Sequence, residues 1–230
     1  MATTSAFIFA RGGSKGLPRK NVLSISGIPM LAHGIRIARS LKEVDNIFVS
    51  TDCDEISSIA QDYGADVIRR PHELASDTAP EWLAWQHAIR YVQERHSSFD
   101  RFLSLPATAP LRNIEDVRAC LNALKKGVDF VITVTPSGRS PWFNMVTLDK
   151  NQLARLVLGN GEVKRRQDAM SCFDITTVAY VSRPEFILNS TGIWDGSVVG
   201  VEVPRSRSID VDDEYDFKIA RFLMEDSKLP

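Results

Sequence analysis

The segment from residue 10 to residue 21 combines glycine with positive charge and is well suited to bind an anion. It reads Ala-Arg-Gly-Gly-Ser-Lys-Gly-Leu-Pro-Arg-Lys-Asn and follows a short apolar run at residues 5–10. Glycines let the backbone turn sharply and point several N–H groups at one anion. Arg11, Lys15, Arg19 and Lys20 add four cations within ten residues. Such a loop can hold triphosphate oxygens and neutralise the charge that builds on a leaving pyrophosphate.

The spacing of this loop excludes two familiar phosphate loops. A Walker A loop needs two glycines separated by four residues and followed by Lys and Ser or Thr, and the dinucleotide fingerprint needs the spacing GxGxxG. An ordinary basic surface turn is the simpler alternative. The loop's place at the carboxyl end of the first predicted strand favours a ligand site, because open α/β sheets bind ligands there.

A second group with chemical potential lies near the other end of the chain, at Asp210 and Asp212. Two residues that are two positions apart in an extended segment point to the same face. Paired carboxylates suit Mg²⁺, a hard cation that takes one or two carboxylates together with phosphate oxygens and water. Alternatively, the pair is an acidic lead-in to a final helix, as Asp213 and Glu214 would be near a helix N-terminus. The residues alone leave both interpretations open.

The rest of the sequence predicts elements that would position these groups in one α/β domain over residues 1–230. Short apolar runs predict strands at 46–50, 66–68, 102–105, 129–134, 175–181 and 197–203. Helical spacing predicts helices at 30–41, 54–63, 78–95, 114–124 and 214–225. Asp77 and Thr78 are suited to cap the helix predicted from residue 78, and contact with a ligand is the alternative. Strands and helices that alternate at this interval indicate a mostly parallel sheet with crossover helices.

Residues 137–174 break this alternation. They contain Trp142 and Phe143, an Asn160-Gly161 turn and the basic run Lys164-Arg165-Arg166. We interpret the segment as a hairpin-like insertion into the domain rather than another crossover.

Composition restricts the kinds of partner. The net charge of −1 predicts no bulk attraction to nucleic acid or to an anionic membrane. The sequence has no signal-peptide pattern and no apolar run of membrane-spanning length, so we expect a cytoplasmic protein. Its three cysteines are scattered and are expected to be reduced thiols. The four histidines lack the partners of a Ser-His-Asp arrangement and are expected to pack or to face solvent.

The loop, followed by Gly27-Ile28-Pro29-Met30-Leu31, resembles the signature of the acylneuraminate cytidylyltransferases. Further segments resemble that family in the same order: Val49-Ser50-Thr51-Asp52, Arg70-Pro71, residues 74–79, Pro106-Ala107-Thr108-Ala109-Pro110-Leu111-Arg112, Arg166-Gln167-Asp168, residues 209–212 and Asp216-Phe217. The resemblance implies a three-layer, Rossmann-like fold with a small dimerisation insertion. It also implies an enzyme that joins CTP to a nonulosonic, sialic-acid-like sugar and releases pyrophosphate.

The resemblance assigns roles to the loop and to one arginine. Arg11 and Lys20 would contact the triphosphate as catalytic cations, and the neighbouring nucleotide-binding positions would be Gly12, Gly13, Ser14 and Asn21. Lys15 would either contact the ligand or lie further out. Arg70 before Pro71 would recognise the base; the alternative is an arginine at a strand end that is bound only to solvent.

The resemblance also favours the metal interpretation of Asp210 and Asp212, with Mg²⁺ or Mn²⁺ as the ion. The sugar hydroxyl attacks the α-phosphorus in this family and must lose a proton. Asp212, a predicted catalytic residue, or a metal-bound hydroxide would take it, and the sequence leaves both routes open.

A nonulosonic acid carries a carboxylate, so its pocket needs an arginine or a lysine. The resemblance points to Arg166, with Gln167 and Thr108 as further sugar contacts. It also implies a homodimer in which basic residues of the insertion reach the partner's site. A solvated basic strand is the alternative.

Three departures from the family pattern concern the sugar side: Leu105 in place of Gln, Phe173 in place of Tyr, and Thr176-Thr177 in place of Asn-Gly. They predict a nine- or eight-carbon sugar acid other than N-acetylneuraminate, such as legionaminic acid, pseudaminic acid or 8-amino-Kdo. Competing hypotheses are a Kdo-type cytidylyltransferase, a metal-dependent glycosyltransferase and a non-catalytic nucleotide-binding homologue.

Overall fold

A computed structural model describes residues 2–14 and 16–226, so the predicted cation Lys15 lies outside the described residues. Its centre is a seven-stranded sheet in the order β11-β7-β10-β6-β1-β4-β5. The strands are β1 (Thr4–Phe9), β4 (Asn46–Thr51), β5 (Asp66–Arg69), β6 (Arg101–Ser104), β7 (Phe130–Pro136), β10 (Phe173–Ser182) and β11 (Val198–Glu202). β10 runs antiparallel to both of its neighbours, β6 and β7, whereas the other pairings are parallel. The predicted, mostly parallel α/β sheet is confirmed.

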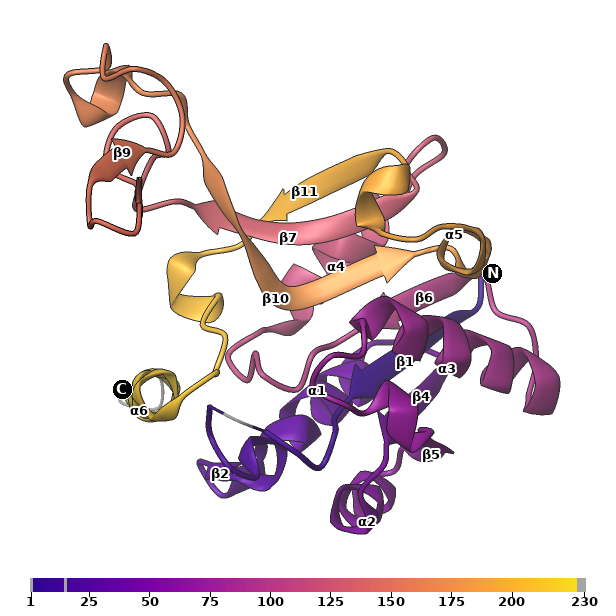
Figure 1. Ribbon diagram of the computed structural model, residues 1–230. Coiled ribbons are helices and arrows are strands. Elements are labelled where there is room, and N and C mark those ends of the chain that lie inside the picture. Colours follow the sequence, from indigo (N-terminus) through magenta and orange to yellow (C-terminus); the bar gives the residue numbers. More distant parts are fainter. Residues whose placement is uncertain (1, 15, 227–230) are drawn as a thin grey trace.

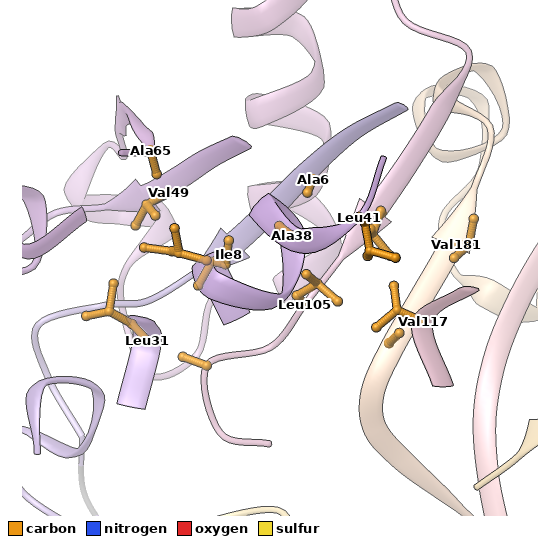
Figure 2. Packing of buried hydrophobic residues seen from close by; sticks show 14 of the residues in the cluster. Ala6, Ile8, Leu31, Ala38, Leu41, Val49, Ala65, Leu105, Val117 and Val181 are labelled. Atoms are coloured by element: carbon orange, nitrogen blue, oxygen red, sulfur yellow. The ribbon is translucent and has the colours of Figure 1, made fainter. Parts of the chain in front are cut away.

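One face of the sheet packs against α1 (Met30–Ser40), α2 (Asp54–Asp62) and α4 (Ile114–Ala123). Alternate strand residues point to this face, as the two-residue period of a strand requires. Figure 2 shows Ala6, Ile8 and Val49 of the sheet against Leu31 and Ala38 of α1. Leu105, one of the three departures on the sugar side, is fully buried in the same cluster.

The opposite face packs against α3 (Glu81–Arg95) and α5 (Pro184–Asn189), which completes three layers (Figure 1). Aromatic rings dominate this side. Phe7 stacks with Phe48 and Phe102 at centroid distances of 5.5 and 4.9 Å, and Trp85 of α3 stacks on Phe130 of β7 at 5.8 Å.

The reversed strand β10 follows from the insertion. The chain leaves β7, forms the two-stranded sheet of β8 (Val146–Leu148) and β9 (Ala154–Leu156), and returns along β10 beside β7. Antiparallel neighbours need only a hairpin-like connection, whereas parallel neighbours need a crossover. In Figure 1 the segment around β9 stands apart from the main sheet. Residues between β7 and β10 thus follow a hairpin-like path rather than a crossover.

A third, smaller cluster closes one end of the domain. α6 (Glu214–Asp226) packs Ala220 and Phe217 near Ile25 and Met30, beside the short hairpin of β2 (Ser24–Ile25) and β3 (Ile28–Pro29). The remaining elements are single turns of 3₁₀ helix: η1 (Lys20–Val22), η2 (His72–Leu74), η3 (Arg166–Asp168), η4 (Ile193–Asp195) and η5 (Arg205–Arg207). Within the described ranges, no helix has the length and apolar character needed to cross a membrane.

The predicted start of the helix at residue 78 is wrong. α3 begins at Glu81, and Pro80 rather than Asp77 or Thr78 occupies its N-cap position. A residue that precedes proline is biased away from helical backbone angles, which accounts for the absence of helix at Ala79. Asp77 is left free of the capping role and pairs with Arg11 instead.

Candidate active site

Most of the residues predicted to bind the nucleotide lie near the carboxyl edge of the parallel strands. Arg11 follows β1, Asp52 follows β4, Arg70 follows β5 and Thr108 follows β6. A cavity of about 260 Å³ at this edge has in its wall Phe9, Arg11, Lys20, Asn21, Arg70, Leu74, Ser76, Asp77, Ala79, Glu81, Ala84 and Thr108. The fold thus brings the loop and Arg70 to one cavity, although they lie about sixty residues apart in sequence.

The first half of the loop is tied to the end of β4. The backbone N–H of Gly12 donates to Asp52 Oδ1 at 2.9 Å, and the side-chain amide of Asn21 donates to the carbonyl oxygen of Arg11 at 3.0 Å. A Cβ at residue 12 would lie 3.0 Å from Cys53 Cβ, which is tighter than ordinary packing. Glycine therefore allows the loop to approach the sheet edge this closely.

Two predicted triphosphate cations are each held by a carboxylate. Arg11 pairs with Asp77 at 2.6 Å, and Lys20 Nζ pairs with Asp212 Oδ1 at 2.8 Å and donates to the Val211 carbonyl oxygen at 2.9 Å. Lys20 is mostly buried, whereas the side chain of Asp212 is 72% exposed. These ion pairs hold the two cations at the cavity. Their oxygen partners surround the cations in the way that the oxygens of a bound phosphate would.

The loop also contacts the acidic segment through backbone atoms. A Cβ at residue 16 would overlap the carbonyl oxygen of Asp212, so only glycine fits there without displacement. The N–H of Val211 donates to the carbonyl oxygen of Thr108 at 2.8 Å, and the Val211 side chain is fully buried. The segment 210–212 is therefore fixed between the loop and the Thr108 turn.

Asp210 has the features expected of a cation ligand. Its Oδ1 atom is buried and has no hydrogen-bond partner among the described residues, and the same is true of Thr177 Oγ1. Burial is the main cause that raises the pKa of Asp210; the charge of Asp212 adds to it, while Thr108, Lys20 and Thr177 oppose it. A buried, unpartnered carboxylate oxygen next to a second carboxylate fits a hard divalent cation.

Arg70 is fixed by several contacts at the floor of the cavity. Its Nε donates to Ser50 Oγ at 3.1 Å and a terminal nitrogen donates to the Ser50 carbonyl oxygen at 2.6 Å. Its guanidinium lies 5.6 Å from the centre of the Phe9 ring, within range of a cation–π interaction. Burial lowers the pKa of Arg70, while the charges of Asp52 and Glu81 act to raise it. Arg70 is thus a cavity residue and not an arginine bound only to solvent.

Glu81 is a cavity residue that the sequence interpretation missed. Much of the residue is accessible to solvent, but its carboxyl group lies in the cavity wall, where desolvation raises its pKa. The indole N–H of Trp85 donates to Glu81 Oε1 at 3.2 Å. An acidic residue in the first turn of a helix is usually explained by its interaction with the helix dipole. The only sequence feature that could have marked Glu81 is its position directly after Pro80.

Other loop residues are placed differently. Arg19 pairs with Glu55 of α2 and lies in the wall of a second, very small cavity together with Gly12 and Asn21. A Cβ at Gly13 would meet none of the described residues within 4 Å. Ser14 is half-buried beside it.

The predicted sugar contacts are not brought together within one chain. Arg166 and Gln167 lie in the wall of a separate cavity of about 380 Å³ at the base of the insertion, whereas Thr108 lies at the first cavity. Of the departures, Phe173 lies at the insertion cavity, Leu105 faces the core, and Thr176 bonds to Thr133 Oγ1 at 2.7 Å.

The contact between residue 16 and Asp212 predicts that Gly16→Ala weakens nucleotide binding. The added methyl group must displace the acidic segment, and we expect the Kd for CTP with Mg²⁺ to rise about tenfold, or about 1.4 kcal/mol. Calorimetric titration measures it. Gly192→Ala is the matched control, since a Cβ there meets nothing within 4 Å. Wild-type affinity in Gly16→Ala would contradict the prediction.

The raised pKa of Asp210 predicts that Asp210→Asn stabilises the protein in the absence of metal. A carboxyl group whose pKa is higher in the folded than in the unfolded state makes the fold less stable as the pH rises from the unfolded pKa through the folded pKa. At pH 7.5 the charge of Asp210 therefore opposes folding. We expect the Tm in EDTA to rise by about 2–4 °C.

Saturating Mg²⁺ should then raise the Tm of the wild type but not that of Asp210→Asn. Thermal unfolding with Asp66→Asn, a change at an exposed carboxylate, provides the control. An Asp210→Asn protein that is less stable than the wild type in EDTA would refute this account of the buried carboxyl.

Comparison with known proteins agrees with this geometry. The family model described as cytidylyltransferase matches residues 5–183. The chain is 33% identical over 225 residues to post-translational flagellin modification protein B of Campylobacter coli, covering 96% of this chain and 95% of the relative. It is also 33% identical over 227 residues to CMP-N,N'-diacetyllegionaminic acid synthase of Campylobacter jejuni subsp. jejuni serotype O:2, covering 97% of this chain and 96% of the relative.

Among solved structures, CMP:2-keto-3-deoxy-manno-octonic acid synthetase complexed with CTP has a TM-score of 0.75 at 18% identity, covering 98% of this chain and 100% of that chain. At this identity the likeness concerns the fold. The family match and the two relatives extend over the loop and most of the cavity wall described above. The chain therefore belongs to the cytidylyltransferase family and is a nucleotidyl-transferring enzyme.

Proposed function

We propose that this enzyme transfers the cytidylyl group of CTP to a nonulosonic acid and releases pyrophosphate. The observation that carries the proposal is the convergence of Arg11, Lys20 and Arg70 on one cavity, with Asp212 joined to Lys20 at its rim. Cations and a hydrogen-bonding loop at the end of β1 suit a triphosphate, and the acidic pair suits the divalent cation that accompanies it.

The base end of the nucleotide fits the floor near Arg70. Its guanidinium is held by Ser50 and lies over Phe9, so its direction is fixed before a ligand binds. A fixed guanidinium supplies N–H donors to the carbonyl oxygen and the ring nitrogen acceptor of cytosine at little entropic cost.

The phosphates would replace the carboxylates that hold the loop cations. Arg11 would leave Asp77 and Lys20 would leave Asp212, and both cations would bind phosphate oxygens of higher charge instead. Asp210 and Asp212 would then hold Mg²⁺ or Mn²⁺, which supplies charge neutralisation on the phosphates when bound. Release of Asp212 from Lys20 thus couples nucleotide binding to the assembly of the cation site.

The reaction breaks one bond and forms another at the α-phosphorus. The anomeric oxygen of the sugar forms the new P–O bond, the bond to the bridging oxygen of the β-phosphate breaks, and pyrophosphate leaves with its electron pair. Lys20 and Arg11 stabilise the charge that moves onto pyrophosphate. The hydroxyl proton needs an acceptor, and the exposed carboxylate of Asp212 is the acceptor that we propose.

For the sugar we propose an acid of the legionaminic kind. The support is the identity of 33% to the diacetyllegionaminic acid synthase, against 28% to N-acylneuraminate cytidylyltransferase of Escherichia coli O18:K1:H7, which the chain matches over half of that protein's length. The departures at Phe173 and Thr176-Thr177 agree with a different sugar side.

A substrate panel tests the proposal. The enzyme is incubated with CTP or UTP and with diacetyllegionaminic acid, pseudaminic acid, N-acetylneuraminate, Kdo or 8-amino-Kdo, and pyrophosphate is measured. We expect CTP with the legionaminic acid to give the highest kcat/KM. N-acetylneuraminate or Kdo as the best acceptor would refute the sugar assignment and leave cytidylyl transfer intact.

Two variants test the catalytic assignment in the same assay. Lys20→Ala and Asp212→Ala should each lower kcat at least about 100-fold, because each removes charge that acts on the transferring group. Lys42→Ala, a change at an exposed lysine after α1, is the control. Unchanged turnover in both site variants would instead support a non-catalytic nucleotide-binding protein.

We further propose that two copies of the chain form a homodimer through the insertion. Large apolar side chains are exposed along this segment, namely Met145, Val146, Leu148, Leu153, Val157, Leu158, Met170, Phe173 and Ile175. An exposed apolar surface of this kind is typical of a protein interface. Arg166 and Gln167 lie apart from the nucleotide cavity of their own chain, so a sugar contact by them requires the cavity of a second copy.

Mixing two inactive variants tests this arrangement. Lys20→Ala disables the nucleotide cavity, and Arg166→Ala removes the proposed contact to the sugar carboxylate. If each site uses residues of both chains, co-refolded mixtures should regain activity, because one of the two sites in a mixed dimer carries neither change. The readout is pyrophosphate release, with ultracentrifugation to establish the dimer. Mixed dimers without regained activity would place Arg166 outside the partner's site.

A further inference from the structure

One ion pair ties the residues just before the acidic segment to helix α4. Arg207 Nε and a terminal guanidinium nitrogen each donate to Asp116, both at 2.8 Å. The two parallel bonds form a fork that fixes direction as well as distance. The Asp116 side chain is only 5% exposed and that of Arg207 is 33% exposed, so solvent competes little for the carboxylate.

Asp116 is itself rigidly held. It is the third residue of α4 and forms a reciprocal capping box with Asn113: its backbone N–H donates to Asn113 Oδ1 at 2.9 Å, and its Oδ2 accepts from the Asn113 N–H at 3.1 Å. α4 packs on the sheet through Val117 and Leu121. The carboxylate that receives Arg207 is therefore part of the rigid core.

Arg207 ends the 3₁₀ turn η5 and precedes Asp210 by three residues. The next fixed point along the chain is the bond from Val211 N–H to the carbonyl oxygen of Thr108 at 2.8 Å. Asp210 lies between these two attachments, and its buried Oδ1 has no partner within the described part of the chain. The side-chain fork and the backbone bond therefore hold the chain on both sides of Asp210.

We propose that Arg207 and Asp116 are positioning residues for the cation held by Asp210 and Asp212. They contact neither substrate nor cation; they fix the carbonyl and carboxylate geometry of residues 208–212. This inference rests on the proposed function, because it assumes that the acidic segment binds a divalent cation together with CTP. Outer residues that orient ligands in this way typically change metal affinity 10–100-fold when they are removed.

The test measures how strongly Mg²⁺ and CTP binding are coupled, without sugar and without turnover. The full-length protein is titrated with CTP by calorimetry, once with excess Mg²⁺ and once with EDTA, and the ratio of the two Kd values gives the coupling. For Arg207→Gln we expect this ratio to fall about tenfold, with the Kd in EDTA unchanged. Arg207→Lys keeps the charge but loses the fork and should give an intermediate ratio.

Arg118→Gln is the matched control. Arg118 also lies at α4, pairs with Glu43 and Glu115, and has a side-chain exposure of 35%, but it has no link to residues 208–212. A loss of coupling in Arg118→Gln equal to that in Arg207→Gln would mean a general effect of α4 stability and would overturn the inference. So would a wild-type ratio in Arg207→Gln.

A double variant adds a second, independent criterion. If the two residues act as one unit, Asp116→Asn with Arg207→Gln should lose no more coupling than the stronger single variant; additive losses would contradict the paired role. Should Arg207→Gln fail to fold, Arg207→Lys and Asp116→Asn carry the same test. Wild-type protein that neither binds CTP nor releases pyrophosphate would refute the proposed function itself, which a changed ratio in the variants alone does not.

Discussion

The contact between Lys20 and the segment around Asp212 holds the candidate active site together. One ammonium group bonds to the Asp212 carboxylate and to the Val211 carbonyl oxygen across 191 or 192 positions of sequence. The fit of Gly16 against the Asp212 carbonyl adds a steric condition at the same point. Because both ends of the chain must meet here, the sheet between them has to place the ends of β1 and β11 on the same edge.

The parallel strands meet that condition and also account for the polar groups at the edge. Parallel strands end together, so short connections after β1, β4, β5 and β6 deliver Arg11, Asp52, Arg70 and Thr108 to one region. Strand β10 runs in the opposite direction, so its first half rather than its end lies at this edge. It brings Thr177 near Asp210. The helices on both faces make the edge rigid through two separate apolar clusters.

The sequence predicted the fold class and the order of most strands and helices, because these depend on local periodicity. It failed where the decisive partner is distant. Asp77 carries a side chain suited to a helix cap, yet a charge 66 positions away in sequence captures it. The sequence analysis also missed Glu81, whose only signal was its place after Pro80, and the fork between Asp116 and Arg207, which lie 91 positions apart. Leu105, a departure from the family pattern on the sugar side, directly follows β6 and is buried in the core.

The position of Val211 has a consequence for biosynthesis. Its side chain and those of Ala220 and Phe217 complete a small cluster with Ile25 and Met30, which lie just after the nucleotide loop. During synthesis, residues 10–21 emerge from the ribosome long before residues 210–212. The bonds from Lys20 to Val211 and Asp212 can therefore form only after the strands and helices between them have been made, so the two parts of the candidate site are joined late.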